Sequence, residues 1–177
     1  MLSFDAKLVL RLSSRPKGLM KGEEIMSDEW IESTVKRIKQ HEEDQRRTKD
    51  YELLRETKIG RAEGGLFEEL QKTLKATIEK LNERFPGSEK RYGIKTRWDE
   101  IELTGPHELS FDIKHDSDKH ELDLSLYVGT SSQPRIDDQV KIDLNESEEV
   151  CFKWQGSCIG VTKLAQALLD LVIEHSL

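Results

Sequence analysis

The sequence predicts an α+β fold: an antiparallel β-meander of about five to six strands, with two helices packed on one face, preceded by a long charged N-terminal helix. Apolar and polar residues alternate with a period of two in four consecutive runs between residues 109 and 154, as in strands with one buried face. Apolar residues recur every three to four positions over 66–85 and 164–173, as in amphipathic helices. Charged residues make up 36% of the chain, so part of it has to remain in water.

The charge is distributed unevenly over three segments. Residues 1–25 carry five basic and three acidic residues, residues 26–61 carry nine of each, and residues 62–177 carry 14 basic and 23 acidic residues. We interpret these segments as a leader, a charged helical arm and an α+β domain. An acidic domain repels phosphate backbones, so we expect no nucleic-acid partner.

Residues 1–25 are predicted to be a disordered leader or translated sequence upstream of a native start at Met26. The run Met26–Trp30 reads like the start of a protein, and the codons of Lys21–Glu23 can spell a purine-rich, ribosome-binding stretch. A targeting peptide is the alternative. The three acidic residues of the leader disfavour it, because such peptides avoid acids.

Residues 27–58 predict one long helix that Ser27 or Asp28 caps. Its first apolar residues recur at helical spacing, but residues 41–50 are almost wholly polar. The segment is therefore either a solvated, partly frayed helix or a docking arm, since a coiled coil needs an unbroken apolar seam. The interaction candidates are Trp30, Ile31, Val35 and Ile38.

The elements of the domain follow from its turns and periodicity. Gly60 and Gly64-Gly65 indicate a break before the amphipathic helix, and Pro86-Gly87 ends that helix. Gln155-Gly156 predicts a tight turn into a short last strand, and Thr162 is expected to cap the final helix. The expected strands are 109–113, 122–128, 140–144, 150–154 and a short last strand at 157–159, whereas the runs 94–98 and 100–103 alternate only weakly.

The hairpin around Ser117 carries the residues most capable of chemistry. A symmetric register sets Asp112 opposite Asp123 on the outer face and His115 opposite His120 at the turn. Two aspartates and two histidines in this arrangement are suited to binding a cation or to general acid–base catalysis. The alternative is an ordinary polar turn with screened carboxylates, which we favour because the spacing matches no common ligand motif. We therefore predict no metal and no cofactor.

Two further groups of residues bear on function. A ligand pocket between sheet and helices would be lined by Trp98, Phe111, Leu124, Trp154 and Leu168. Cys151 and Cys158 are too few for a disulfide scaffold, so we expect packing residues or half-exposed thiols in a reducing cytoplasm. No apolar run approaches the roughly 20 residues of a membrane-spanning helix, so we expect no membrane partner.

Three functions follow from these observations. We expect a non-catalytic, cytoplasmic interaction protein of adaptor or chaperone-like type, whose arm binds another protein or a second copy and whose acidic α+β domain recognises another protein. The alternatives are a small-ligand binder and, third, a metal-dependent hydrolase using the hairpin residues. The lack of a phosphate loop, a nucleophile elbow or a zinc-protease motif disfavours an enzyme. The order helix–sheet–helix resembles helix-grip ligand binders and small secretion chaperones in architecture, which does not fix function.

The start of the native protein is open to direct test. N-terminal sequencing of natively expressed protein is expected to give Met26, or Ser27 after removal of methionine, as the first residue. Recovery of peptides from Leu8–Leu19 in quantity would contradict this expectation.

Overall fold

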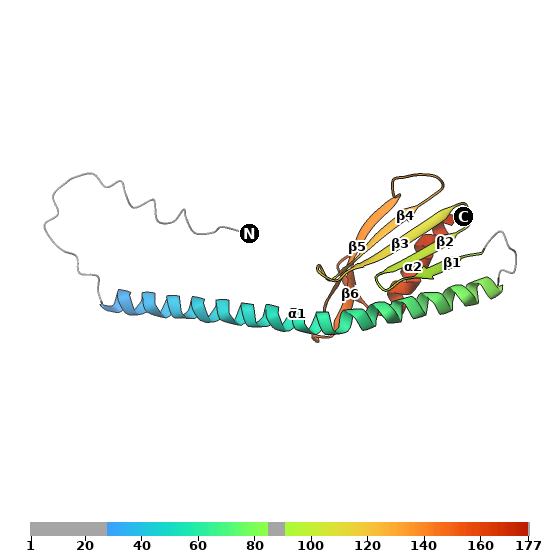
Figure 1. Ribbon diagram of the computed structural model, residues 1–177. Helices are drawn as coiled ribbons and strands as arrows, with labels where there is room; N and C mark the ends of the chain where they lie inside the picture. Colours follow the sequence, from blue (N-terminus) through green and yellow to red (C-terminus); the bar gives the residue numbers. More distant parts are fainter. Residues whose placement is uncertain (1–27, 85–90, 177) are drawn as a thin grey trace, which may run out of the picture. The chain divides into compact units, whose positions relative to one another are not determined.

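The computed structural model describes residues 28–84 and 91–176. In chain order, its elements are α1 (Asp28–Arg84), β1 (Gly93–Thr96), β2 (Glu100–Gly105), β3 (Leu109–Asp116), β4 (Glu121–Tyr127), β5 (Ile136–Leu144), β6 (Val150–Trp154), β7 (Ser157–Ile159) and α2 (Val161–Ser176). The strands form one antiparallel sheet in chain order (Figure 1). The predicted α+β meander is confirmed, with seven strands instead of five to six. The prediction for residues 1–25 lies outside the described residues.

The sheet has one apolar face because its strands alternate. On β3, Phe111 and Ile113 are fully buried, and Leu124 and Leu126 face them from β4. The intervening side chains, such as Ser125, lie on the opposite face. At the far end of the sheet, Gln155 and Gly156 both have positive φ, at 49° and 82°. These values suit the predicted tight turn between β6 and β7.

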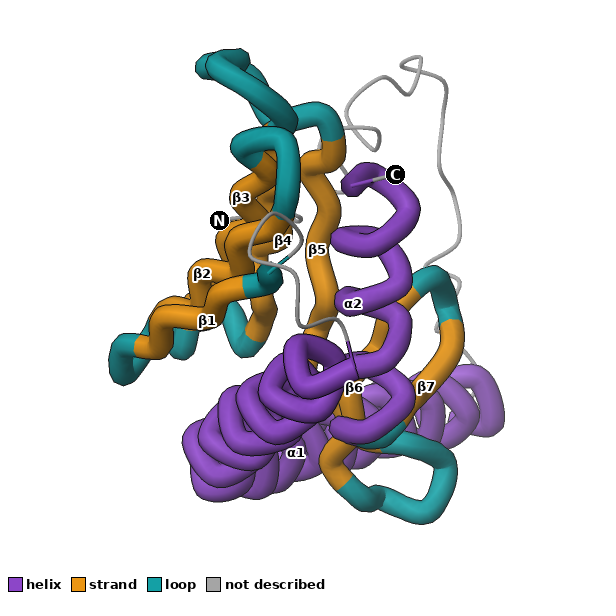
Figure 2. The backbone as a smooth tube through the Cα atoms, turned by 90° about the vertical axis from the view of Figure 1, so that its right-hand side faces the viewer, coloured by secondary structure: helices purple, strands orange, loops and turns teal. Residues whose placement is uncertain are grey.

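Helix α2 and the C-terminal half of α1 lie on the same side of this sheet (Figure 2). Both helices contribute fully buried side chains to one core, which they share with the inner face of the strands. The fully buried leucines of the helices are Leu70, Leu74, Leu164 and Leu168. Helix α2 begins at Val161, where the carbonyl of Gly160 accepts from the N–H of Leu164. Thr162 therefore lies inside the first turn, and its predicted capping role is wrong.

The predicted break at Gly60 and Gly64-Gly65 is also wrong, because α1 continues through all three glycines. A glycine costs a helix about 1 kcal/mol relative to alanine. The spacing of Ile59, Glu63 and Phe67 explains the continuity, since these residues bury one face of the helix on the body of the protein. Tertiary burial outweighs the local preference here.

The chain divides into two compact units, Met1–Arg46 and Arg47–Leu177, which are described separately below. Part of the segment predicted as arm belongs to the second unit. Ile59 is fully buried in the core, Arg55 forms an ion pair with Asp143 at 2.9 Å, and Lys58 forms one with Glu148 at 2.5 Å. Residues 55–59 are therefore fastened to the sheet by both apolar and ionic contacts.

The two cysteines are paired. Cys151 at the start of β6 forms a disulfide with Cys158 of β7, and their Cα atoms are 5.7 Å apart. The expectation of packing residues or half-exposed thiols is therefore wrong. The pairing was not evident in the sequence because two cysteines seven residues apart match no common framework; the tight β6–β7 turn brings them together.

Asp143 keeps its charge in spite of its position. Burial opposes ionisation of the carboxyl. Hydrogen bonds from Arg55 and from the backbone N–H of Leu144, with the charges of Arg55 and Lys153, outweigh that effect and hold the pKa of Asp143 below its ordinary value. A carboxyl whose pKa is lower in the folded state favours folding at a pH above its unfolded pKa.

We expect Leu124→Ala to lower the free energy of unfolding by about 2–5 kcal/mol, because it leaves a cavity in the core. Ser125→Ala, one residue along on the outer face, should cost less than about 0.5 kcal/mol. Denaturant melts of the two variants measure the difference. Equal costs would contradict the assignment of the inner face.

We expect Arg55→Gln to destabilise the protein at neutral pH and to have progressively less effect as the pH falls below about 4, the ordinary pKa of an aspartate, toward the lower pKa that Asp143 has in the folded protein. Denaturant midpoints measured between pH 7 and pH 3 test this. Arg61→Gln, which removes the same charge from an exposed position of α1, serves as the control. A destabilisation by Arg55→Gln that does not vary with pH would contradict the role of the ion pair.

Candidate functional sites

The first candidate is the apolar stripe at the start of α1. Trp30, Ile31, Val35 and Ile38 have 49%, 46%, 43% and 53% of their surface exposed. Of the eight large apolar side chains exposed among residues 28–84 and 91–176, seven belong to the first half of α1, which adds Tyr51, Leu53 and Leu54. Isolated exposed apolar residues are ordinary, but a cluster on one stretch of helix marks an interaction surface.

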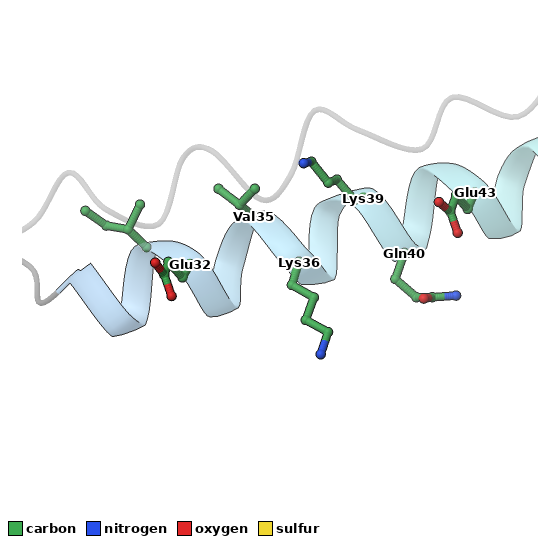
Figure 3. A pocket seen from close by; sticks show the side chains of 7 residues that line it. Glu32, Val35, Lys36, Lys39, Gln40 and Glu43 are labelled. Atoms are coloured by element: carbon green, nitrogen blue, oxygen red, sulfur yellow. The ribbon is translucent and has the colours of Figure 1, made fainter.

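The side chains of this stretch divide between the sides of the helix. Figure 3 shows Val35 and Lys39 on one side and Lys36 and Gln40 on the other. The pocket on this stretch of α1 is lined by Ile31, Glu32, Val35, Lys36, Lys39, Gln40 and Glu43. The apolar groups are therefore bordered by charges of both signs.

The second candidate site is the β3–β4 hairpin, whose register differs from the predicted one by two residues. Ile113 faces Leu124, Asp112 faces Ser125, and Lys114 faces Asp123. The expected opposition of Asp112 and Asp123 is therefore wrong, as is that of the two histidines. A carboxyl oxygen of Asp116 accepts from the N–H groups of residues 118 and 119 at 3.1 and 3.2 Å, which sets the turn one residue later than a symmetric hairpin around Ser117.

Both histidines of this hairpin approach one buried carboxylate of α1. His120 Nδ1 lies 2.7 Å from Glu63 Oε2, and His115 Nε2 lies 3.7 Å from the same oxygen. The Glu63 side chain is 10% exposed, that of His115 8%, and that of His120 25%. The structure thus brings the two predicted histidines together, although through Glu63 and not by facing each other across the strands. We call Glu63, His115 and His120 the His–Glu cluster.

The ring of His115 packs against an aromatic neighbour, but one of its nitrogens has no hydrogen-bond partner among the described residues. Its ring stacks on Phe67, with centroids 5.1 Å apart and an angle of 26° between the planes. Its Nε2 is buried and has no hydrogen-bond partner among the described residues. A buried polar atom without a partner costs about 1–3 kcal/mol. Such atoms are rare in folded proteins and call for an explanation.

The two predicted aspartates lie on the outer face of the sheet. Asp123 belongs to an acidic group with Asp116 and Glu121, whose carboxylate oxygens lie within 4.8 Å of one another. Lys119 is 2.8 Å from Asp116, and Gln139 donates to Asp123 at 2.9 Å, so this group already has partners. Asp112 accepts from Ser110 at 3.3 Å, and burial raises the pKa of its carboxyl. The four hairpin residues proposed for metal-dependent hydrolysis therefore occupy three separate places.

The candidate pocket residues are dispersed. Phe111, Leu124 and Leu168 are fully buried in the core, whereas Trp98 follows β1 with 83% of its surface exposed. Trp154 is partly buried, and its Nε1 donates to Asp138 Oδ2 at 2.8 Å. This placement gives little support to a ligand pocket between the sheet and the helices.

A groove does lie between the two helices, and none of the candidate pocket residues lines it. Its volume is about 320 Å³. Its walls mix apolar and polar side chains from both helices: Thr73, Thr77, Leu81, Thr162, Ala165, Gln166, Leu169, Asp170 and Ile173. Its one charged lining residue, Asp170, is exposed, so the groove offers few of the directed polar contacts by which pockets orient a ligand.

Glu63 is the site residue that the sequence reasoning missed. The signal was an acidic residue on an apolar stripe, four positions after Ile59 and four before Phe67. It was hidden because the neighbouring glycines suggested a break, and a residue in a linker has no assigned face. A single acid on the buried side of a helix indicates a polar partner across the core.

Comparisons with known proteins add no assignment: no family model matches this chain, and neither the curated proteins nor the solved structures give a significant match. Within the described residues, neither helix combines the length and the apolar character needed to cross a bilayer.

Proposed function

We propose that this chain is a non-catalytic interaction protein of adaptor or chaperone-like type, whose helical arm binds a second copy of the chain. The observation that carries the proposal is the exposure of Ile31, Val35 and Ile38 at three- and four-residue spacing on one stretch of α1. Helices gain little in water unless such a stripe packs on another surface.

The charge of the arm favours a second copy as the occupant. Segment 26–61 carries nine basic and nine acidic residues, so two such segments have no net repulsion. Lys36 and Lys39 border the stripe together with Glu32 and Glu43, so each copy offers both signs to the other. Such pairs at the rim set orientation more than affinity.

The size of the stripe limits the strength of association. Burying an aliphatic side chain fully yields about 1.5–3 kcal/mol, and roughly half of that is available to a half-exposed one. Three side chains from each of two copies thus yield on the order of 6 kcal/mol, against which association costs several kcal/mol. That sum alone falls short of the about 8 kcal/mol of a micromolar dimer. A reversible dimer with a dissociation constant in the micromolar range or above therefore also needs contacts from Trp30, Tyr51, Leu53 and Leu54, which are exposed on the same helix.

The alternatives have less support. A small-ligand binder requires an enclosed apolar cavity, and the residues first considered for it are mostly in the core or in solvent. A metal-dependent hydrolase requires its acids and histidines in one place, and the structure separates them.

We predict that the double change Ile31→Asp with Ile38→Asp abolishes self-association and leaves the melting temperature of the domain nearly unchanged. Light scattering on the full chain at about 0.1 mM measures the mass, because that concentration populates a dimer of micromolar affinity. Ser33→Asp with Arg37→Gln is the control: it changes the net charge by the same two units at exposed positions of this stretch of α1 that do not line its pocket.

Retention of the dimer by the control and its loss in the double isoleucine variant supports the proposal. A monomeric wild-type chain at this concentration contradicts it. Unfolding of the domain by the isoleucine changes would mean that the stripe belongs to the core, which also contradicts it.

A further inference from the structure

We propose that the disulfide between Cys151 and Cys158 is a reversible redox switch: a dithiol opens it by attack on Cys158, and its opening loosens the contact of α1 with the sheet at Asp143. All of these residues, and the part of α1 that contacts Asp143, lie in the second compact unit. The switch therefore does not depend on the dimer.

The disulfide joins two residues of one hairpin and does not connect distant parts of the fold. Three residue pairs already hold β7 on β6, and the two cysteines are only seven positions apart in sequence. A disulfide constrains the unfolded chain less when the loop that it closes is short. The core is held by other contacts, because β6 also pairs with β5, and Leu164 and Leu168 of α2 are fully buried. Opening the bond therefore frees β7 without unfolding the domain.

The two sulfur atoms of the disulfide differ in access. Cys158 is exposed on β7, the last strand of the sheet, whereas only 8% of the surface of Cys151 is exposed. Cys158 also lines an open hollow of about 510 Å³, which Lys153 and Gly156 line as well. Access to a sulfur atom is one of the factors that decide where a thiolate attacks a disulfide. The attacking thiolate thus has room to reach Cys158 and not Cys151.

The exchange balances in atoms and electrons. One thiolate of the dithiol attacks the Sγ atom of Cys158, forms a mixed disulfide with it and displaces Cys151 as a thiolate, which takes up a proton. The second sulfur of the dithiol, as a thiolate, then attacks the first and displaces Cys158. Two electrons have passed to the cysteines, and the dithiol has become a disulfide. A small disulfide such as oxidised glutathione takes back the two electrons and closes the bond.

The bond lies beside the ion pairs that hold α1 on the sheet. Cys151 is directly opposite Asp143 in the register of β5 and β6. Asp143 forms ion pairs with Arg55 at 2.9 Å and with Lys153 at 3.7 Å, and Lys153 faces Cys158 across β6 and β7. Side chains that face each other on antiparallel strands are close neighbours on one face of the sheet. Opening the bond releases the neighbours of Asp143, which then holds Arg55 less firmly.

The first experiment reduces the full chain with dithiothreitol and counts the thiols that appear. We expect both cysteines to become reactive while the folded circular-dichroism signal persists, and oxidised glutathione to restore the bond. In Cys151→Ser, iodoacetamide should modify Cys158 at least about tenfold faster than it modifies Cys151 in Cys158→Ser. Unfolding of the domain as the bond opens would make the disulfide a structural staple and overturn the proposal. Equal rates of modification would overturn the assignment of Cys158 as the attacked sulfur.

The second experiment measures the link to α1 with Arg55→Gln in the oxidised and the reduced chain. We expect the shift in denaturant midpoint that this change causes to be smaller by about half or more after reduction, because two perturbations of one network are not additive. Arg61→Gln, at an exposed position of α1, is the control and should cause the same shift in both redox states. An equal shift for Arg55→Gln in both states would overturn the link between the disulfide and α1.

Discussion

The rest of the structure depends on covering one apolar face of a seven-stranded sheet. Fully buried side chains from five of the strands and both helices meet there, among them Phe111, Phe152, Leu70 and Leu168. Neither helix spans the whole face, so both are needed to remove it from water. The continuity of α1 through three exposed glycines follows from this demand, because a break at Gly60 would take Ile59 off the face.

The elements could be predicted from the sequence because burial imposes a period, of two on strands and near 3.6 on helices. Register could not. A slip of one residue moves every side chain to the opposite face, but a slip of two restores the pattern. The expected pairing of Ile113 with Leu122 and the observed pairing with Leu124 therefore satisfy the same alternation. The turn decides between the two registers, because Asp116 accepts backbone hydrogen bonds there and His120 has a positive φ of 55°.

Contacts that depend on register and tertiary packing also limited how much of the candidate site could be predicted. His115 and His120 could be selected because both side chains bind metals and flank one turn. Glu63 lies more than fifty residues earlier, and no local pattern joins it to the hairpin. Its contact depends on which face of α1 meets which strand, a tertiary choice that is made only when the helix packs. The disulfide between Cys151 and Cys158 was missed although the turn between them was predicted, because the two cysteines do not pair across that turn: Cys158 pairs with Lys153.

The meander order has a consequence for how the chain reaches its native state. Each strand pairs with its neighbour in sequence, and the connections are short, so the loops closed in forming the sheet cost little entropy. Forming the core costs more loop entropy than forming the sheet, because it brings together residues far apart in sequence, such as Leu70 and Leu168. Hairpins formed early would expose an apolar face until both helices arrive. The slow step of folding is then the docking of helices on a sheet that is already assembled in part.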